Sequence, residues 1–197
     1  RGRAAPGRGD LMVRGDVAGA GHRQVLRAAL ADEVRLPLVD GAADSPATEM
    51  LGQVLAATRP ARAVVHLHGD LGAGKSTLAR ALLRALGVQG AIRSPTYTLV
   101  ERYPVPGGEA WHLDLYRIGS ASELDFLGLD GDEASLWLVE WPERGAGALP
   151  PADLRVWLQQ QGPGRLAELE AGSAAGQAWL AAVQETGRLR VLPAGGP

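Results

Sequence analysis

The stretch HGDLGAGKST at residues 68–77 constrains the fold of this chain more than any other. It has the spacing G-x-x-x-x-G-K-[ST], follows the apolar run 63–67 and precedes a helical pattern over 78–86. A strand, a glycine-rich turn and a helix in this order point backbone N–H groups into one concavity, and the helix adds the positive end of its dipole. The pattern predicts a phosphate-binding loop, in which Lys75 reaches the terminal phosphates of a nucleoside triphosphate and the Ser76 hydroxyl holds Mg²⁺.

The use of lysine supports this interpretation. Lys75 is the only lysine among the 20 lysine and arginine residues of the chain. Arginine therefore replaces lysine everywhere except where a compact, flexible ammonium is needed. The plain alternative is a glycine-rich turn without a ligand, because the chain has 27 glycines. Chance gives the four fixed positions of the motif in roughly one of a thousand such chains, which favours the loop.

Composition sets the wider limits. A chain of 197 residues with 46% hydrophobic residues is long enough to bury one domain core. The absence of cysteine excludes disulfides and thiolate zinc sites, and a net charge of −2 gives no overall electrostatic case for nucleic acid. No apolar run approaches the roughly 18 residues that span a bilayer, so we expect a cytoplasmic protein without a membrane partner.

The chain divides into three parts by its pattern. Six arginines stand against Asp10 and Asp16 in the first 27 residues, and we expect a disordered basic extension over 1–32, with a short helix possible at 22–31. Residues 33–187 read as the phosphate-loop domain and 188–197 as a flexible tail. Strands are expected near 34–38, 62–68, 97–103, 110–116, 136–140, 154–159 and 165–170, a turn at 104–108, and helices near 44–57, 78–86, 122–126, 132–135 and 173–184.

This mixed order of elements predicts the fold class. Strands and helices alternate around the loop, and hairpin-type strands flank that unit. We therefore expect a three-layer α/β domain, like that of P-loop NTPases, with a mixed central sheet flanked by helices.

Two acidic residues end apolar strands. Glu140 closes LWLVE, and Asp114 lies in WHLDLY. If both strands neighbour the loop strand, their carboxyl ends reach the sheet edge that carries the phosphates. We interpret Glu140 as the metal carboxylate and Asp114 as the group that positions the attacking water; the alternative for each is a solvated carboxylate at a strand end.

Other residues have weaker signals. His66 with His68, and His112 with Asp114, lie two apart on strands and share a face, so a metal cluster is conceivable although strands give such spacing by accident. Ser94-Pro95-Thr96 is either a phosphate-sensing switch or an ordinary turn. Trp141 follows Glu140 and lies either at the nucleotide or in the core.

Five motifs in order, HGDLGAGKST, SPTYTLVERY, HLDLYR, SELDFLGLD and LVEWPERGAGALPPADL, closely resemble the TsaE (YjeE) family over about 36–183. The resemblance implies an ATPase that assists the TsaD and TsaB proteins in threonylcarbamoylation of the adenosine adjacent to the tRNA anticodon, with tRNA contacted through the partners. It implies ATP and Mg²⁺ as cofactors, Asp114 and Lys75 as catalytic residues, and Ser76 and Glu140 as metal ligands. The nucleotide contacts that it implies are Gly72, Ala73, Gly74, Lys75, Ser76, Thr77, Asp44, Thr96, Trp141 and Arg165.

Ser76 stands where the family most often has threonine, which keeps the hydroxyl. Two alternatives stay open: a small-molecule or nucleoside kinase, and a binding module that holds nucleotide without hydrolysing it. A GTPase is disfavoured because the guanine-reading N-K-x-D signature needs an asparagine, and the chain contains none.

Overall fold

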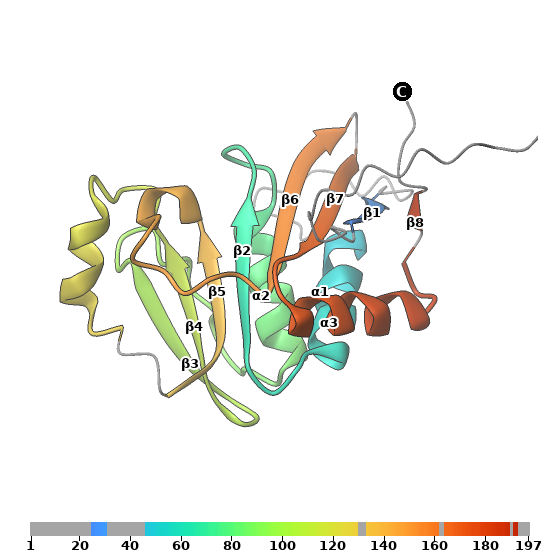
Figure 1. Ribbon diagram of the computed structural model, residues 1–197, viewed down its shortest axis with the longest axis horizontal. Coiled ribbons are helices and arrows are strands. Elements are labelled where there is room, and N and C mark those ends of the chain that lie inside the picture. The colour runs from blue at the N-terminus through green and yellow to red at the C-terminus, as the bar shows by residue number, and fades with distance from the viewer. Residues whose placement is uncertain (1–24, 31–45, 130–132, 162–163, 190, 193–197) are drawn as a thin grey trace, which may run out of the picture.

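Eight strands, in the parts of the chain that the structure describes, form one mixed sheet. The structure is a computed structural model, and it describes residues 25–30, 46–129, 133–161, 164–189 and 191–192. The strands lie in the order β3-β4-β5-β2-β6-β7-β1-β8 (Figure 1). Their bounds are β1 Val25–Leu30, β2 Ala63–His68, β3 Val100–Val105, β4 Gly108–Asp114, β5 Ala134–Glu140, β6 Leu154–Gln161, β7 Gly164–Ala171 and β8 Val191–Leu192.

The centre of the sheet is parallel and its flanks are antiparallel. Strands β4, β5, β2 and β6 run parallel to one another. Outside them, β3 pairs antiparallel with β4, and β7, β1 and β8 continue antiparallel from β6. Because parallel strands end at the same edge, the carboxyl ends of β2, β4 and β5 meet there, and this is where ligands bind in open α/β sheets.

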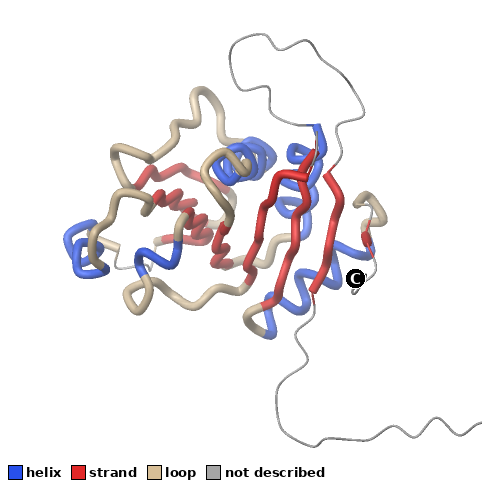
Figure 2. The backbone as a smooth tube through the Cα atoms, turned by 90° about the horizontal axis from the view of Figure 1, so that it is seen from above, coloured by secondary structure: helices blue, strands red, loops and turns tan. Residues whose placement is uncertain are grey.

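The two faces of the sheet carry separate hydrophobic clusters. On β5, Leu136 and Leu138 pack with the helices, whereas Trp137 and Val139 pack beneath two 3₁₀ helices on the opposite face. Seen from above, the strands turn progressively across the sheet (Figure 2). The helices of the first face are α1 Pro46–Thr58, α2 Lys75–Ala85 and α3 Ala174–Glu185, and those of the second are η1 Ala121–Leu127 and η2 Pro142–Gly145.

Most of the predicted elements are confirmed. The strand before the loop, the helix after it, the strand ending at Glu140 and the last helix all form. Ser173 begins α3 as predicted, because its side chain accepts a hydrogen bond from the backbone N–H of Gly176 at 3.1 Å. The predicted mixed sheet in a three-layer domain is also confirmed, with 3₁₀ helices in place of α-helices in the outer layer of the second face.

Two helices predicted from local pattern are wrong. Residues 25–30 form β1 rather than part of a helix, because they pair with β7 from Val25 opposite Glu170 to Leu30 opposite Arg165. This long-range pairing overrides the helix propensity of VLRAAL. The helix expected at 132–135 is also wrong, since β5 already begins at Ala134.

The hairpin that follows residues 94–96 differs from the prediction in both strands, because β3 lies later in the chain than expected and β4, predicted at 110–116, lies earlier. Strand β3 begins at Val100 rather than Tyr97 and continues through Pro104, which was expected in a turn. Proline is tolerated there because β3 is the edge strand of the sheet. In the predicted tail, residues 191–192 form β8 beside β1. The predicted strand at 34–38 and residues 1–24 lie outside the described residues. None of the helices that the structure describes is long and apolar enough to cross a bilayer.

Helices α1 and α2 approach most closely at Gly52. A Cβ added at Gly52 would lie 2.6 Å from the Cβ of Ala81 and 2.8 Å from the backbone nitrogen of Leu82. We predict that Gly52→Ala lowers the free energy of unfolding by about 1–3 kcal/mol through overpacking. Urea unfolding measures this, with Ala57→Ser on the exposed side of α1 as a control expected within about 0.5 kcal/mol of wild type. A variant as stable as wild type would contradict this packing.

Candidate active site

The loop between β2 and α2 has the backbone of a phosphate-binding loop. Gly69 leaves β2 with φ 133°, and a Cβ there would lie 2.3 Å from the carbonyl oxygen of Leu158. Gly74 caps α2 with φ 110° in the left-handed region, where a side chain is disfavoured. Helix α2 has no side-chain cap, so its first N–H groups point towards the open space before the helix.

That open space is a cavity of about 330 Å³ at the carboxyl edge of the sheet. Its volume and its wall of glycine, hydroxyl, carboxylate and aromatic groups suit a phosphorylated ligand. It is lined by Leu71, Gly72, Gly74, Lys75, Ser76, Thr77, Thr96, Asp114, Tyr116, Glu140, Trp141 and Arg165.

The ammonium of Lys75 is buried at the base of this cavity. Lys75 Nζ donates to the carbonyl oxygens of Gly69 at 2.6 Å and Asp70 at 2.8 Å, and it lies 4.1 Å from the centroid of the Trp141 ring. Burial lowers the pKa of Lys75, while Glu140 and Asp114 act in the opposite direction. A compact cation is thus held among carbonyls and one aromatic face, at the start of the helix.

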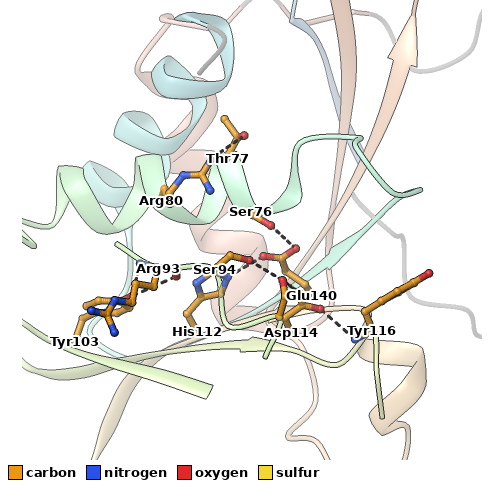
Figure 3. Close-up of polar contacts among 11 residues, drawn as sticks. Ser76, Thr77, Arg80, Arg93, Ser94, Tyr103, His112, Asp114, Tyr116 and Glu140 are labelled. Atoms are coloured by element: carbon orange, nitrogen blue, oxygen red, sulfur yellow. Dashed lines mark hydrogen bonds and ion pairs between the residues drawn. The ribbon is translucent and has the colours of Figure 1, made fainter. Parts of the chain in front are cut away.

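Ser76 and Glu140 meet across the cavity, as the sequence interpretation requires. Ser76 Oγ donates to Glu140 Oε2 at 2.9 Å, a contact drawn in Figure 3. Glu140 is only 2% exposed. The other carboxylate oxygen, Glu140 Oε1, lies 2.8 Å from His112 Nε2. The carboxylate at the end of β5 is therefore held at both oxygens.

Asp114 lies beside Glu140 at the end of the neighbouring strand, because the parallel register of β4 and β5 places the two opposite one another. Asp114 Oδ2 accepts from Thr96 Oγ1 at 2.8 Å. Asp114 Oδ1 accepts from the backbone N–H of Tyr116 at 3.1 Å, and Figure 3 shows this contact. Thr96 Oγ1 is also 2.8 Å from Ser94 Oγ. The segment interpreted as a switch thus contacts the carboxylate interpreted as positioning water.

Trp141 forms one wall of the cavity rather than part of the deep core. It follows Glu140 with φ 57°, a left-handed conformation that is rare for a tryptophan. This turn brings its ring against Tyr116, with centroids 5.0 Å apart, and against Lys75. Trp141 thus lines the cavity and also packs against the second hydrophobic cluster, and its contact with nucleotide stays a prediction.

The remaining predicted contacts divide into three groups. Arg165 on β7 lines the cavity. Its Nε would lie 3.1 Å from a Cβ added at Gly74, so the arginine side chain passes close to the loop backbone. Thr77 also lines the cavity, whereas Ala73 is buried in the core and is not among the residues that line it. Asp44 lies outside the described residues.

The donor set fits Mg²⁺ once phosphates are counted. Mg²⁺ takes oxygen ligands and is usually held by one or two carboxylates together with phosphate oxygens and waters. Ser76 Oγ and Glu140 Oε2 are two such oxygens, 2.9 Å apart. Within the described ranges, no group of three or more His, Cys, Asp or Glu side chains is arranged to hold a metal. The metal cluster of histidines and aspartate considered above therefore gains no support.

His66 and His68 lie instead on the opposite face of β2, at a second cavity of about 240 Å³ below η2. Burial, with smaller contributions from His68 and Arg155, lowers the pKa of His66 to about 4 from the ordinary 6.5. The unfolded chain protonates this ring below about pH 6.5, but the folded protein resists protonation until about pH 4. The stability that the neutral ring contributes is thus fully present above pH 6.5 and is lost as the pH falls towards 4.

We therefore predict that the free energy of unfolding falls less for His66→Gln than for wild type between pH 7 and pH 4.5. The difference between the two decreases should be about 1–2 kcal/mol, because the ring is partly buried. Denaturant unfolding at several pH values measures the difference, and the values at pH 8 serve as the reference. Parallel curves for the two proteins across this range would show that His66 titrates normally in the folded state.

Three residues of the site were not assigned from sequence, and one of them, Leu71, lies inside the loop motif and lines the cavity. Tyr116 lines the cavity and lies against Trp141 with the two rings tilted by 50°, and His112 contacts Glu140. The only sequence signal for His112 was its position two residues before Asp114, on the same face of a strand. Nothing in the sequence singled out Tyr116.

Comparison with known proteins assigns the chain to a family. The family model described as "Threonylcarbamoyl adenosine biosynthesis protein TsaE" matches residues 42–167. The tRNA threonylcarbamoyladenosine biosynthesis protein TsaE of Haemophilus influenzae is 46% identical over 108 residues, which cover 54% of this chain and 68% of that protein. The protein of the same name from Streptomyces coelicolor is 40% identical over 110 residues, covering 54% of this chain and 74% of that protein.

A solved structure shares the fold. The crystal structure of YdiB from Bacillus subtilis aligns with a TM-score of 0.64 at 21% identity, covering 85% of this chain and 99% of that one. The P-loop NTPase-like fold predicted from the sequence is thereby confirmed. With its phosphate loop and the acidic strand ends in place, and with a family model matched from residue 42 to residue 167, this chain belongs to the TsaE family of threonylcarbamoyladenosine biosynthesis proteins.

Proposed function

We propose that this protein binds ATP with Mg²⁺ and hydrolyses it, and that hydrolysis supports threonylcarbamoylation of the tRNA adenosine adjacent to the anticodon by the TsaD and TsaB proteins. One observation carries the proposal: Lys75, Ser76, Asp114 and Glu140, from three separate elements, converge on a single cavity at the mouth of the phosphate loop. A loop that bound phosphate without hydrolysis would not need a second buried carboxylate beside the first.

Each side chain has a role that follows from its position. The N–H groups at the start of α2 cradle the phosphates, and Lys75 exchanges the carbonyls of Gly69 and Asp70 for the terminal phosphate oxygens. Ser76 and Glu140 hold Mg²⁺, which when bound neutralises charge that develops on the phosphates. Trp141 and Arg165 also line the cavity.

Asp114 acts on the attacking water. Its Oδ1 is fixed by the N–H of Tyr116, and its Oδ2 accepts from Thr96, so its position depends on the segment Ser94 to Thr96. Movement of Thr96 would release one carboxylate oxygen to accept a proton from water. This connection gives partners that bind the segment a way to control hydrolysis.

A reconstituted reaction tests the proposal. TsaD, TsaB, tRNA, ATP and an activated threonylcarbamoyl donor are combined with this protein, and we expect repeated rounds of tRNA modification with release of inorganic phosphate. Lys75→Ala and Glu140→Ala should abolish the effect, whereas Glu185→Ala, at an exposed position at the end of α3, should not. Full multiple turnover without the protein would end the proposal. Phosphate appearing on an added small molecule would favour a kinase, and modification with intact ATP would favour a binding module.

A further inference from the structure

We propose that His112 is a positioning residue that fixes the carboxylate of Glu140 for Mg²⁺. The inference rests on the proposed function, because it assigns Glu140 to the metal. It concerns a residue of β4 that does not line the cavity itself and acts through Glu140.

The contact is made inside the protein. His112 is fully buried, and its Nε2 lies 2.8 Å from Glu140 Oε1 (Figure 3). The two residues occupy the same face of neighbouring strands: His112 is opposite Leu138 in the parallel register, and Glu140 is two residues further along β5. The ring therefore reaches diagonally from one strand to the end of the next.

The chemistry of the pair defines the hydrogen bond. An ionised carboxylate only accepts hydrogen bonds, so with Glu140 ionised, as a metal ligand is, the hydrogen of this contact lies on His112 Nε2. His112 Nδ1 has no hydrogen-bond partner among the described residues. The hydrogen bond to Glu140 is therefore what distinguishes this buried ring from an apolar side chain of the same size, which would fill the space equally well.

The hydrogen bond has two consequences for Glu140. First, it ties Oε1, which prevents rotation of the carboxylate and leaves Oε2 directed at Ser76 and the cavity. Second, Glu140 lies opposite Asp114, and like charges at opposed positions on neighbouring strands repel. The hydrogen bond from His112 keeps the Glu140 carboxylate in place although Asp114 repels it. Partners behind a metal ligand typically change metal affinity by 10–100-fold when removed.

Two substitutions of similar polarity separate this role from packing. Glutamine at 112 can place an amide N–H where Nε2 lies, whereas the shorter asparagine reaches only as far as Nδ1. Binding of a fluorescent ATP analogue to the full chain is titrated with Mg²⁺, and repeated in EDTA. We expect His112→Asn to raise the Mg²⁺ concentration at half-saturation on the order of 10-fold or more, with affinity in EDTA unchanged within about twofold, and His112→Gln to restore most of the loss.

A measurement without ligand tests the contact independently. In the ligand-free wild type, the ¹H–¹⁵N spectrum of the histidine rings should show the His112 Nε2–H slowly exchanging with solvent, and Glu140→Ala should remove that protection. An unprotonated Nε2, an equal loss for asparagine and glutamine, or equal losses in EDTA and Mg²⁺ would overturn the positioning role. Wild-type protein that bound no ATP in either medium would instead refute the proposed function, and the ring spectrum would still decide the contact.

Discussion

Exchanging Lys75 for arginine is expected to lower kcat/KM for ATP hydrolysis on the order of 100-fold or more, although the positive charge is kept. The ammonium lies between the carbonyls of Gly69 and Asp70 and the Trp141 ring, and it is 5% exposed. A planar guanidinium with five N–H donors is too large for this space and cannot turn from the carbonyls to a phosphate as an ammonium can.

The measurement is steady-state phosphate release in the presence of TsaD and TsaB. Arg84→Lys, the reverse exchange at an exposed position on the same helix, is the matched control and should leave the rate unchanged. Turnover of Lys75→Arg close to that of wild type would show that charge alone suffices, and the compact shape of the single lysine would then need another explanation.

Asp114→Asn is expected to lower kcat by about 100-fold to 10,000-fold while ATP affinity stays within about threefold of wild type. Asparagine keeps the shape of the side chain and can still accept from Thr96 or from the N–H of Tyr116, so the cavity should persist. It lacks the negative charge that takes a proton from water, so the loss should fall on the chemical step.

Single-turnover phosphate release, with binding of a fluorescent ATP analogue measured separately, distinguishes the two effects. Asp125→Asn, at an exposed position of η1, controls for the removal of one negative charge. If binding and hydrolysis of Asp114→Asn fell by the same factor, Asp114 would serve in binding rather than in activation of water.

The part of the site carried by continuous sequence was predictable, because each signal was local. The loop motif fixed the turn between β2 and α2, and apolar runs ending in acids placed Asp114 and Glu140 at strand ends. The parallel order of strands then brought these acids to the loop, as the general rule for α/β sheets states.

What could not be predicted depends on pairing between distant segments. The diagonal contact of His112 with Glu140 follows from the register of β4 on β5, which no local pattern gives. Likewise, β1 becomes a strand only because β7 lies beside it, although VLRAAL alone favours a helix. The position of Trp141 in the cavity wall depends on its left-handed backbone conformation, which no local sequence pattern predicts.

The place of β2 in the sheet has a consequence for how the protein is made. Its neighbours β5 and β6 both follow it in the chain, with Ala63 opposite Leu136 and Val65 opposite Leu154. During synthesis, the glycine loop and α2 leave the ribosome well before either neighbour exists. The chain loses conformational entropy in closing such long loops before the strand contacts form that stabilise the closed state. Pairing at the centre of the sheet is therefore slow. The nascent chain therefore carries the loop motif without the complete cavity until β5, β6 and β7, which supplies Arg165, have emerged and joined the sheet.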